Sequence, residues 1–252
     1  MRESTVLTAW KSGRHVVNGW LSIPNSFSAE LMAKAGWDSI TIDLQHGLID
    51  YQAAVGMMQA IATTPVASLV RVPWNDPAII MKCLDAGAYG VICPLVNNVE
   101  EAKRFVGACR YPPAGFRSMG PIRAVPHAGA DYVAKSGETI VCLAMIETAE
   151  GLRNVDEIAA TPGLDGIYIG PADLSLALGL PGQLDPTAPQ AIAAIDTILR
   201  SCRQAGRRCG IHTGSVAYAA AMIEKGFDMV TVLSDARFII DGARQTIAAL
   251  RR

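Results

Sequence analysis

Signals for β-strands and α-helices alternate along the whole sequence, and this alternation strongly limits the folds open to the chain. Short apolar segments bounded by Gly, Pro, Asn or Asp precede segments whose apolar residues recur every three or four positions. Eight strands are predicted, at 16–23, 39–43, 66–72, 90–93, 140–146, 166–169, 208–212 and 229–233. Eight strands, each followed by a helix, predict an α/β fold of the (β/α)8 or TIM barrel type.

The length of the chain agrees with one such barrel. A total of 252 residues matches a single barrel domain, which we expect to span 1–252. A doubly wound open sheet is the alternative, but no G-x-G-x-x-G motif follows the first strand. Residues 110–138 and 178–189 have no clear periodicity and are expected to be long loops. Loops of this length in a compact domain are often functional.

Charge and cysteine content exclude several classes of function. The net charge is −1, so no basic surface for nucleic acid or for a polybasic membrane contact is indicated. No apolar run approaches the 18 or so residues of a membrane span. The six cysteines form no C-x-x-C pair and are expected to be buried free thiols. These features predict a cytoplasmic protein whose partners are small molecules and copies of itself.

Two predicted strands each end on a carboxylate. Glu147 follows the strand 140–146, and Asp173 follows the strand 166–169 through Gly170. Strands in a strand-helix-strand unit are parallel, so both acids can meet at one edge of the sheet. Two such oxygen ligands suit Mg²⁺ or Mn²⁺. The structural alternative is that Glu147 caps a helix and Asp173 occupies a turn.

Other polar residues also follow predicted strands. Asp43 and His46 follow the second strand, Arg71 the third and His212 the seventh. The C-terminal ends of the strands carry the catalytic residues of TIM barrels. Taken singly, His46 is explained by a turn and Arg71 by pairing with a nearby acid. Their joint placement predicts an active site at this end of the barrel.

Five segments of the sequence resemble one enzyme family. They are IDLQHG at 42–47, RVPWNDP at 71–77, RYPPAGFRSMG at 110–120, MIET at 145–148 and GPADLS at 170–175. In this order they are similar to the metal-dependent class II pyruvate aldolases, which include 4-hydroxy-2-oxoheptane-1,7-dioate aldolase and 2-keto-3-deoxy-rhamnonate aldolase. The resemblance covers nearly the whole chain. It implies reversible cleavage of 4-hydroxy-2-oxo acids to pyruvate and an aldehyde.

The resemblance also implies a role for individual residues. Glu147 and Asp173 would bind the divalent cation, which would be Mg²⁺, Mn²⁺ or Co²⁺. His46 would be the acid-base residue, Arg71 would bind the substrate and stabilise its oxyanion, and Asp85 would raise the basicity of the histidine. The backbone at Gly170 and Ala172 would receive the substrate carboxylate. The family further implies a hexamer of barrels in which the C-terminal helix is exchanged between subunits.

Two positions depart from the commonest family pattern. Gln45 stands where Glu is frequent, and Met145 stands where a glutamine contacts the substrate. A thioether cannot replace both the donor and the acceptor of an amide. We therefore expect Met145 to lie beside the substrate and to alter the range of substrates, with the metal ligands intact.

Other mechanisms remain to be compared with this one. A Schiff-base aldolase needs a lysine near the substrate carbonyl, and none of the six lysines falls in a predicted strand. Alternatives with related chemistry are an oxaloacetate decarboxylase or a synthase that traps the enolate. A barrel that binds a keto acid without turning it over is the non-enzymatic alternative, although such a binder does not require His46.

Two further expectations concern the long loop and the assembly. Arg117, Arg123 and His127 in the loop 110–138 are expected to contact polar groups of the aldehyde. Asp85 falls at the end of a predicted helix that runs away from the strand ends. It can therefore reach a catalytic His46 only from a neighbouring chain, which predicts an oligomer.

Overall fold

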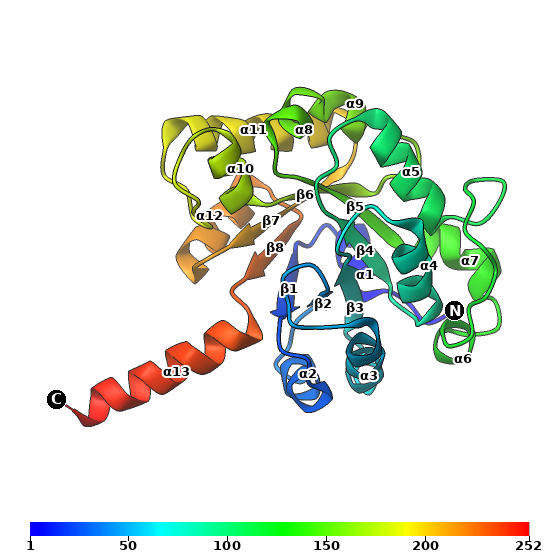
Figure 1. Cartoon of the computed structure of the whole chain (residues 1–252), viewed down its shortest axis with the longest axis horizontal. Coiled ribbons are helices and arrows are strands. Elements are labelled where there is room, and N and C mark those ends of the chain that lie inside the picture. Colours follow the sequence, from blue (N-terminus) through cyan, green and yellow to red (C-terminus); the bar gives the residue numbers. More distant parts are fainter. Residues whose placement is uncertain (252) are drawn as a thin grey trace.

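Eight parallel strands close into a barrel in the order of the sequence (Figure 1). The computed structural model describes residues 1–251. The strands are β1 Val16–Leu21, β2 Ser39–Asp43, β3 Ala67–Arg71, β4 Gly90–Cys93, β5 Val141–Ile146, β6 Gly166–Ile169, β7 Arg208–Thr213 and β8 Met229–Val232. Strand β1 pairs with both β2 and β8, which closes the sheet. The prediction of a TIM barrel is confirmed.

Helices surround the barrel and return the chain to the start of each next strand. They are α1 Thr5–Lys11, α2 Ser26–Ala33, α3 Tyr51–Ile61, α4 Pro77–Asp85, α5 Val99–Cys109, α6 Ala124–Ala128, α7 Tyr132–Thr139, α8 Ala149–Arg153, α9 Val155–Ala159, α10 Pro171–Ala177, α11 Pro189–Gln204, α12 Val216–Lys225 and α13 Asp235–Leu250. Local sequence begins several of them. Asp76 accepts a hydrogen bond from the Ala78 N–H at 2.9 Å, and Pro77 holds the first position of α4.

The register of the strands brings polar residues to one rim. Asp43 and Arg71 are direct partners in the β2–β3 pair, at the last position of each strand. All eight strands run in the same direction, so the residues that follow them collect at that same rim. The register thus assembles the predicted active-site end of the barrel.

Hydrogen-bonded side chains cross the barrel interior among apolar neighbours. Asn18 on β1 is fully buried and donates to the hydroxyls of Thr41 on β2, at 3.0 Å, and Thr231 on β8, at 2.8 Å. Thr231 also accepts from the hydroxyl of Tyr168 on β6 at 2.6 Å. Strands β6 and β8 are not neighbours, so this last bond spans the inside of the barrel. Buried polar groups of this kind are stable only when each finds a partner.

Two parts of the chain are more helical than the sequence pattern predicts. The segment 110–138 was expected to be a loop, but it holds α6 and most of α7. Pro and Gly residues interrupt the apolar periodicity in this segment, so its short helices could not be predicted from the sequence. Residues Thr5–Lys11 form α1, for which no element was predicted. The N-terminal amino group pairs with Asp131 before α7, at 2.7 Å, and so fastens the start of the chain to the same region.

The path after β6 also differs in detail from the expectation. Residues 170–173 do not continue as an extended loop, because Pro171 starts α10 with Gly170 as its N-cap residue. Proline suits the first helical position since its missing N–H would have no partner there. Asp173 therefore lies in the first turn of a helix. The connection between α10 and α11 is long, as predicted.

Helix α13, drawn in red in Figure 1, projects away from the barrel. Only its first residue, Asp235, is buried, and Asp235 accepts hydrogen bonds from the N–H groups of Ser22, at 2.8 Å, and Ile23, at 3.2 Å. The rest of the helix exposes apolar side chains, namely Phe238, Ile239, Ile240, Ile247 and Leu250. An apolar surface of this kind in one chain is typical of a protein contact.

All six cysteines are buried and free, as expected. None of the helices within residues 1–251 has both the length and the apolar character needed to cross a bilayer.

The interior hydrogen bonds of Asn18 provide a test of how the barrel is stabilised. Replacing Asn18 with Ala removes its hydrogen bonds to the hydroxyls of Thr41 and Thr231 and the acceptor that its side-chain oxygen gives to the Ser39 hydroxyl. The free energy of unfolding should fall by about 1–3 kcal/mol, which corresponds to roughly 2–10 °C in Tm for a chain of this size. Thermal unfolding followed by circular dichroism measures this loss. Gln52→Ala, at an exposed amide on α3, is the control; equal shifts for both variants would contradict the role of Asn18.

Candidate active site

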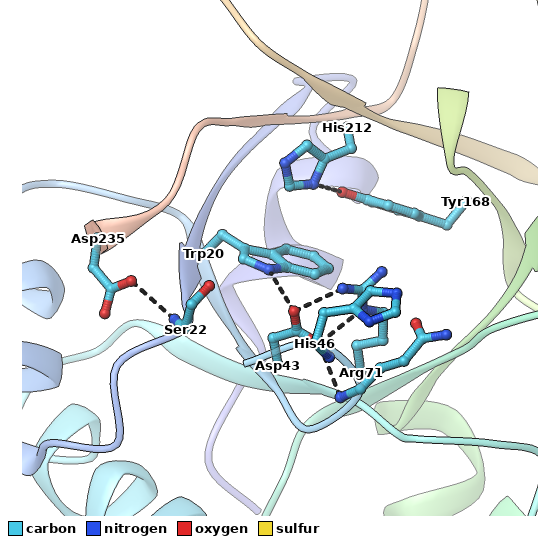
Figure 2. Close-up of polar contacts among 9 residues, drawn as sticks. Trp20, Ser22, Asp43, His46, Arg71, Tyr168, His212 and Asp235 are labelled. Carbon is cyan, nitrogen blue, oxygen red and sulfur yellow. Dashed lines mark hydrogen bonds and ion pairs between the residues drawn. The ribbon is translucent and has the colours of Figure 1, made fainter. Parts of the chain in front are cut away.

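A cavity of about 520 Å³ opens at the C-terminal rim of the barrel. It is lined by residues at or just after the ends of seven of the eight strands, all except β4, together with the starts of α10 and α13 and one residue of the connection between α10 and α11. These are Trp20, Ser22, His46, Arg71, Met145, Gly170, Pro171, Ala172, Asp173, Leu184, His212, Gly214, Leu233, Ser234 and Arg237. Figure 2 shows part of this group around Trp20. The cavity has the size usual for small-molecule sites.

Asp43 organises one side of the cavity, as the dashed lines in Figure 2 show. Its carboxylate accepts hydrogen bonds from Arg71 Nε at 2.8 Å and Arg71 Nη2 at 2.6 Å. It also accepts from Trp20 Nε1 at 3.2 Å and from the N–H groups of Gln45, at 3.0 Å, and His46, at 3.3 Å. Burial alone would raise the pKa of Asp43, but these hydrogen bonds and the charge of Arg71 hold it below its ordinary value. Asp43 is therefore a carboxylate that holds its neighbours in place.

Arg71 is 8% exposed and reaches the cavity from the end of β3. Its pairing with Asp43 confirms that it has a neighbouring acid, yet this pair uses only Nε and one N–H of Nη2. The guanidinium carbon lies 4.8 Å from the centre of the Trp20 ring. The remaining N–H groups make no hydrogen bond to residues 1–251, so a fixed cation is left for a bound anion or oxyanion.

His46 is exposed and lines the cavity from the loop after β2. Its backbone N–H is fixed by Asp43, while its imidazole makes no hydrogen bond within the described chain. The structure thus brings His46 and Arg71 to the same cavity, in agreement with the sequence prediction.

Glu147 is 3% exposed and lies directly after β5. Its Oε1 accepts a hydrogen bond from the N–H of Leu95 at 2.9 Å, and Leu95 adopts the left-handed backbone conformation, with φ of 54°. Burial raises the pKa of Glu147 to about 7, and the charge of Asp173 adds to this shift. Thr148, and not Glu147, caps the helix that follows. A helix-capping role therefore does not explain this buried carboxylate.

A side chain at position 170 would have to displace the ends of Met145 and Glu147. A Cβ atom there would lie 2.5 Å from Met145 Cε and 2.6 Å from Glu147 Oε2. Gly170 therefore lets the wall of the cavity pack against Glu147, which does not itself line the cavity. Met145 is buried and lines the cavity beside Gly170, where the sequence comparison expected a residue next to the substrate.

The first turn of α10 forms the part of the cavity wall next to Gly170. Ala172 and Asp173 both line the cavity, and Asp173 is exposed. The N–H groups of these two residues donate no hydrogen bond to any residue in the described range 1–251. Such free N–H groups at the start of a helix favour a negatively charged ligand.

Glu147 and Asp173 meet the basic requirements of a divalent cation. Within residues 1–251, no three or more His, Cys, Asp or Glu side chains cluster as a metal site would. Mg²⁺, however, often uses one or two protein carboxylates and takes its other ligands from water and substrate. Glu147 and Asp173 are close enough for one charge to affect the other. Two hard oxygen donors beside an open cavity fit an ion of this type.

Trp20 and the partners of His212 were not identified from the sequence pattern. Trp20 is buried on β1, and its ring packs edge to face on His212 with centroids 4.9 Å apart. His212 Nδ1 lies 3.3 Å from the hydroxyl of Tyr168. Burial lowers the pKa of His212 to about 4, and the nearby charge of Arg71 lowers it further. The positions of these residues at strand ends are the signal that could have identified them.

Asp85 and the long loop lie elsewhere. Asp85 ends α4 and pairs with Arg117 at 2.7 Å, so in its own chain it does not meet His46. Arg117 is buried, with its guanidinium 4.6 Å from the Tyr111 ring. Arg123 donates to backbone carbonyls, including Met58 O at 3.4 Å, and His127 packs against Tyr89. In their own chain these loop residues are held by local partners near α4 and do not line the cavity, so their contact with the aldehyde stays a prediction.

Comparison with known proteins agrees with this geometry. Residues 18–242 match the family model for HpcH/HpaI aldolase/citrate lyase. A hydroxypyruvate/pyruvate aldolase of Rhizorhabdus wittichii is 42% identical over 246 residues, covering 98% of this chain and 98% of that protein. A 4-hydroxy-2-oxo-heptane-1,7-dioate aldolase of Salmonella dublin is 38% identical, covering 95% of this chain and 92% of that protein.

A solved structure supports the same relationship. The crystal structure of an HpcH/HpaI aldolase/citrate lyase family protein from Burkholderia cenocepacia superposes with a TM-score of 0.89 at 31% identity. The match covers 94% of this chain and 95% of that chain. With its barrel, its rim residues and these matches, the chain belongs to the HpcH/HpaI aldolase/citrate lyase family and is a lyase of the pyruvate aldolase type.

Proposed function

We propose that this enzyme cleaves 4-hydroxy-2-oxo acids reversibly to pyruvate and an aldehyde with the help of a divalent cation. The observation that carries the proposal is the cavity shared by the fixed cation of Arg71, the imidazole of His46 and the acid Asp173, with Glu147 packed behind its wall. The names of the two curated relatives, both aldolases, support it.

Glu147 and Asp173 would hold the cation, which would be Mg²⁺, Mn²⁺ or Co²⁺. When bound, the cation supplies a Lewis acid for the keto and carboxylate oxygens of pyruvate and so stabilises the enolate without a covalent link to the protein. Burial raises the pKa of Glu147, which means that the ionised carboxylate is disfavoured when it has no positive partner. A bound cation would stabilise the ionised form.

Arg71 would stabilise the charge that develops on the keto oxygen. Asp43 holds the guanidinium with two hydrogen bonds, so its remaining N–H groups need no reorganisation when the oxyanion forms. Preorganised donors of this kind contribute most when little water is present.

The substrate carboxylate would be received next to Gly170 and Ala172. The free N–H group of Ala172 at the start of α10 provides a donor for this carboxylate. Met145 would contact pyruvate at this wall through its thioether and offer no amide.

His46 would take the proton from the 4-hydroxyl group as the C3–C4 bond breaks and would return it in the condensation direction. Its place on a loop at the cavity edge allows contact with an incoming aldehyde. Asp85 of a neighbouring chain would raise the basicity of this histidine.

The assembly would be a homo-oligomer, and the family resemblance favours a hexamer with exchanged α13. The exposed apolar residues of α13 support this, since one chain leaves them uncovered. The free, buried cysteines support a reducing, cytoplasmic setting.

Activity should require an added divalent cation. Purified enzyme treated with EDTA should lose pyruvate release from a 4-hydroxy-2-oxo acid, and Mg²⁺, Mn²⁺ or Co²⁺ should restore it. Borohydride with pyruvate should cause no inactivation, because no lysine lines the cavity. Full activity in EDTA together with borohydride inactivation would overturn the metal mechanism.

Glu147→Ala and Asp173→Ala should lose cation binding and keep the fold. Both residues lie at the rim, so Tm in EDTA should stay within about 4 °C of the wild type. Titration with Mn²⁺ by calorimetry should show binding by wild type and by the control Glu150→Ala, an exposed acid on α8. Normal Mn²⁺ affinity in both rim variants would refute these ligands.

A shared active site predicts complementation between two inactive variants. His46→Ala and Asp85→Ala chains should each be nearly inactive alone. Co-expressed, they should recover about a quarter of wild-type activity, since random assembly gives that share of sites one intact His46 and one intact neighbouring Asp85. Steady-state assays of the mixed oligomer, isolated with two different affinity tags, measure this recovery. Absence of recovery in a confirmed mixed oligomer would show that Asp85 does not act across subunits.

A further inference from the structure

His212 is a cavity residue to which the aldolase mechanism above gives no task. It is the fifth residue of β7, and Figure 2 shows its ring above Trp20 and next to the hydroxyl of Tyr168. Its Nδ1 lies 3.3 Å from that hydroxyl. The ring is therefore held in one orientation by a residue from the neighbouring strand β6.

The hydrogen bonds of Tyr168 favour one tautomer of His212. Tyr168 has one hydroxyl proton, and it donates that proton to Thr231 Oγ1 at 2.6 Å. Thr231 Oγ1 also accepts from the buried Asn18 at 2.8 Å, so these three side chains form one network inside the barrel. With its proton directed to Thr231, the Tyr168 oxygen accepts from Nδ1–H of His212, and in this arrangement Nε2 is left as an acceptor.

Nε2 is free to meet a ligand. It makes no hydrogen bond to any residue between 1 and 251, and in Figure 2 it points away from Tyr168, toward the side on which Ser22 and Asp235 lie. His212 and Ser22 both line the cavity. Burial and the nearby Arg71 lower the pKa of His212 to about 4, so the imidazole is neutral at neutral pH and the acceptor is retained.

Trp20 separates this acceptor from the groups assigned to pyruvate. One face of the Trp20 ring lies 4.8 Å from the Arg71 guanidinium, and the ring packs edge to face on His212 at 4.9 Å. Trp20 is itself fixed by its bond to Asp43. His212 thus faces a part of the substrate other than the oxyanion that Arg71 would bind.

We propose that His212 determines specificity by accepting a hydrogen bond from a substrate hydroxyl carried on the carbon next to the carbonyl group. This rests on the proposed aldolase function and adds a substrate class to it. Two substrates carry such a hydroxyl: a 3-hydroxy-2-oxo acid, used in place of pyruvate, and a 2-hydroxyaldehyde, used as the acceptor. A substrate without the hydroxyl would give Nε2 no partner of its own, which favours the hydroxylated member of each pair.

The test is a panel of four reactions in which the keto acid and the aldehyde are each used with and without the hydroxyl group. Pyruvate or hydroxypyruvate is condensed with acetaldehyde or glycolaldehyde in the presence of Mg²⁺. Wild type is compared with His212→Phe and His212→Leu, two apolar side chains of different volume. His212→Gln restores an acceptor, and His15→Phe is the matched control at an exposed histidine before β1.

The expected result is a change in selectivity. The ratio of kcat/KM for the hydroxylated over the plain substrate should fall roughly ten- to a hundredfold in both apolar variants. It should recover at least in part in His212→Gln and stay at the wild-type value in His15→Phe. A fall confined to the hydroxypyruvate pair assigns the contact to the nucleophile, and a fall confined to the glycolaldehyde pair assigns it to the acceptor.

Equal losses for all four reactions, or unchanged ratios in a folded variant, would overturn the proposal. Calorimetry separates its failure from failure of the aldolase function. Hydroxypyruvate and pyruvate are titrated into wild type and each variant with Mg²⁺ present. Inactive wild type that still prefers hydroxypyruvate, and loses this preference in the apolar variants, would refute aldol cleavage and uphold His212. A wild type that binds both acids equally and turns over both aldehydes with equal efficiency would refute His212 alone.

Discussion

The candidate site depends on one buried carboxylate. Asp43 accepts five hydrogen bonds, which come from Arg71, Trp20 and the backbone of the loop that carries His46. It thereby joins the ends of three strands and sets the position of a cation, an aromatic wall and a histidine together. Removing one partner of a buried ion pair costs about 3–5 kcal/mol, because the other charge is left without compensation. The same hydrogen bonds therefore set the geometry of the cavity and stabilise the rim of the barrel.

The barrel could be predicted because its strands are short, apolar and buried on both faces. Residues such as Val91 and Ile92 on β4 have no exposed surface, so their segments read as plain apolar runs between turn residues. The same reasoning failed where short helices contain breakers. Pro126 lies inside α6 and Gly137 inside α7, and neither helix shows an apolar period long enough to recognise. Their order comes from contacts such as the hydrogen bond from Tyr132 to the carbonyl of Leu84.

The site was predicted in part, for a geometric reason. Parallel strands bring their last residues to one rim, so His46, Arg71 and Asp173 could be placed at a common cavity from their positions alone. Met145 was placed beside the substrate through the family resemblance. Contacts between strands that are distant around the barrel could not be predicted in this way. The bond from Tyr168 to Thr231 joins β6 to β8 and depends on the diameter of the closed barrel. The pairing of Asp85 with Arg117 could not be predicted either, because a fold alone does not specify side-chain partners.

Trp20 gives the cavity a property that matters for how such enzymes change. Its ring lies 4.8 Å from the Arg71 guanidinium and packs edge to face on His212, and the charge of Arg71 also lowers the pKa of His212. Substitutions at residues that share a partner usually have non-additive effects. A new residue at position 212 would therefore also act, through this one indole, on the groups around Arg71. Changes of substrate preference on β7 are in this sense coupled to the groups that would cleave the bond.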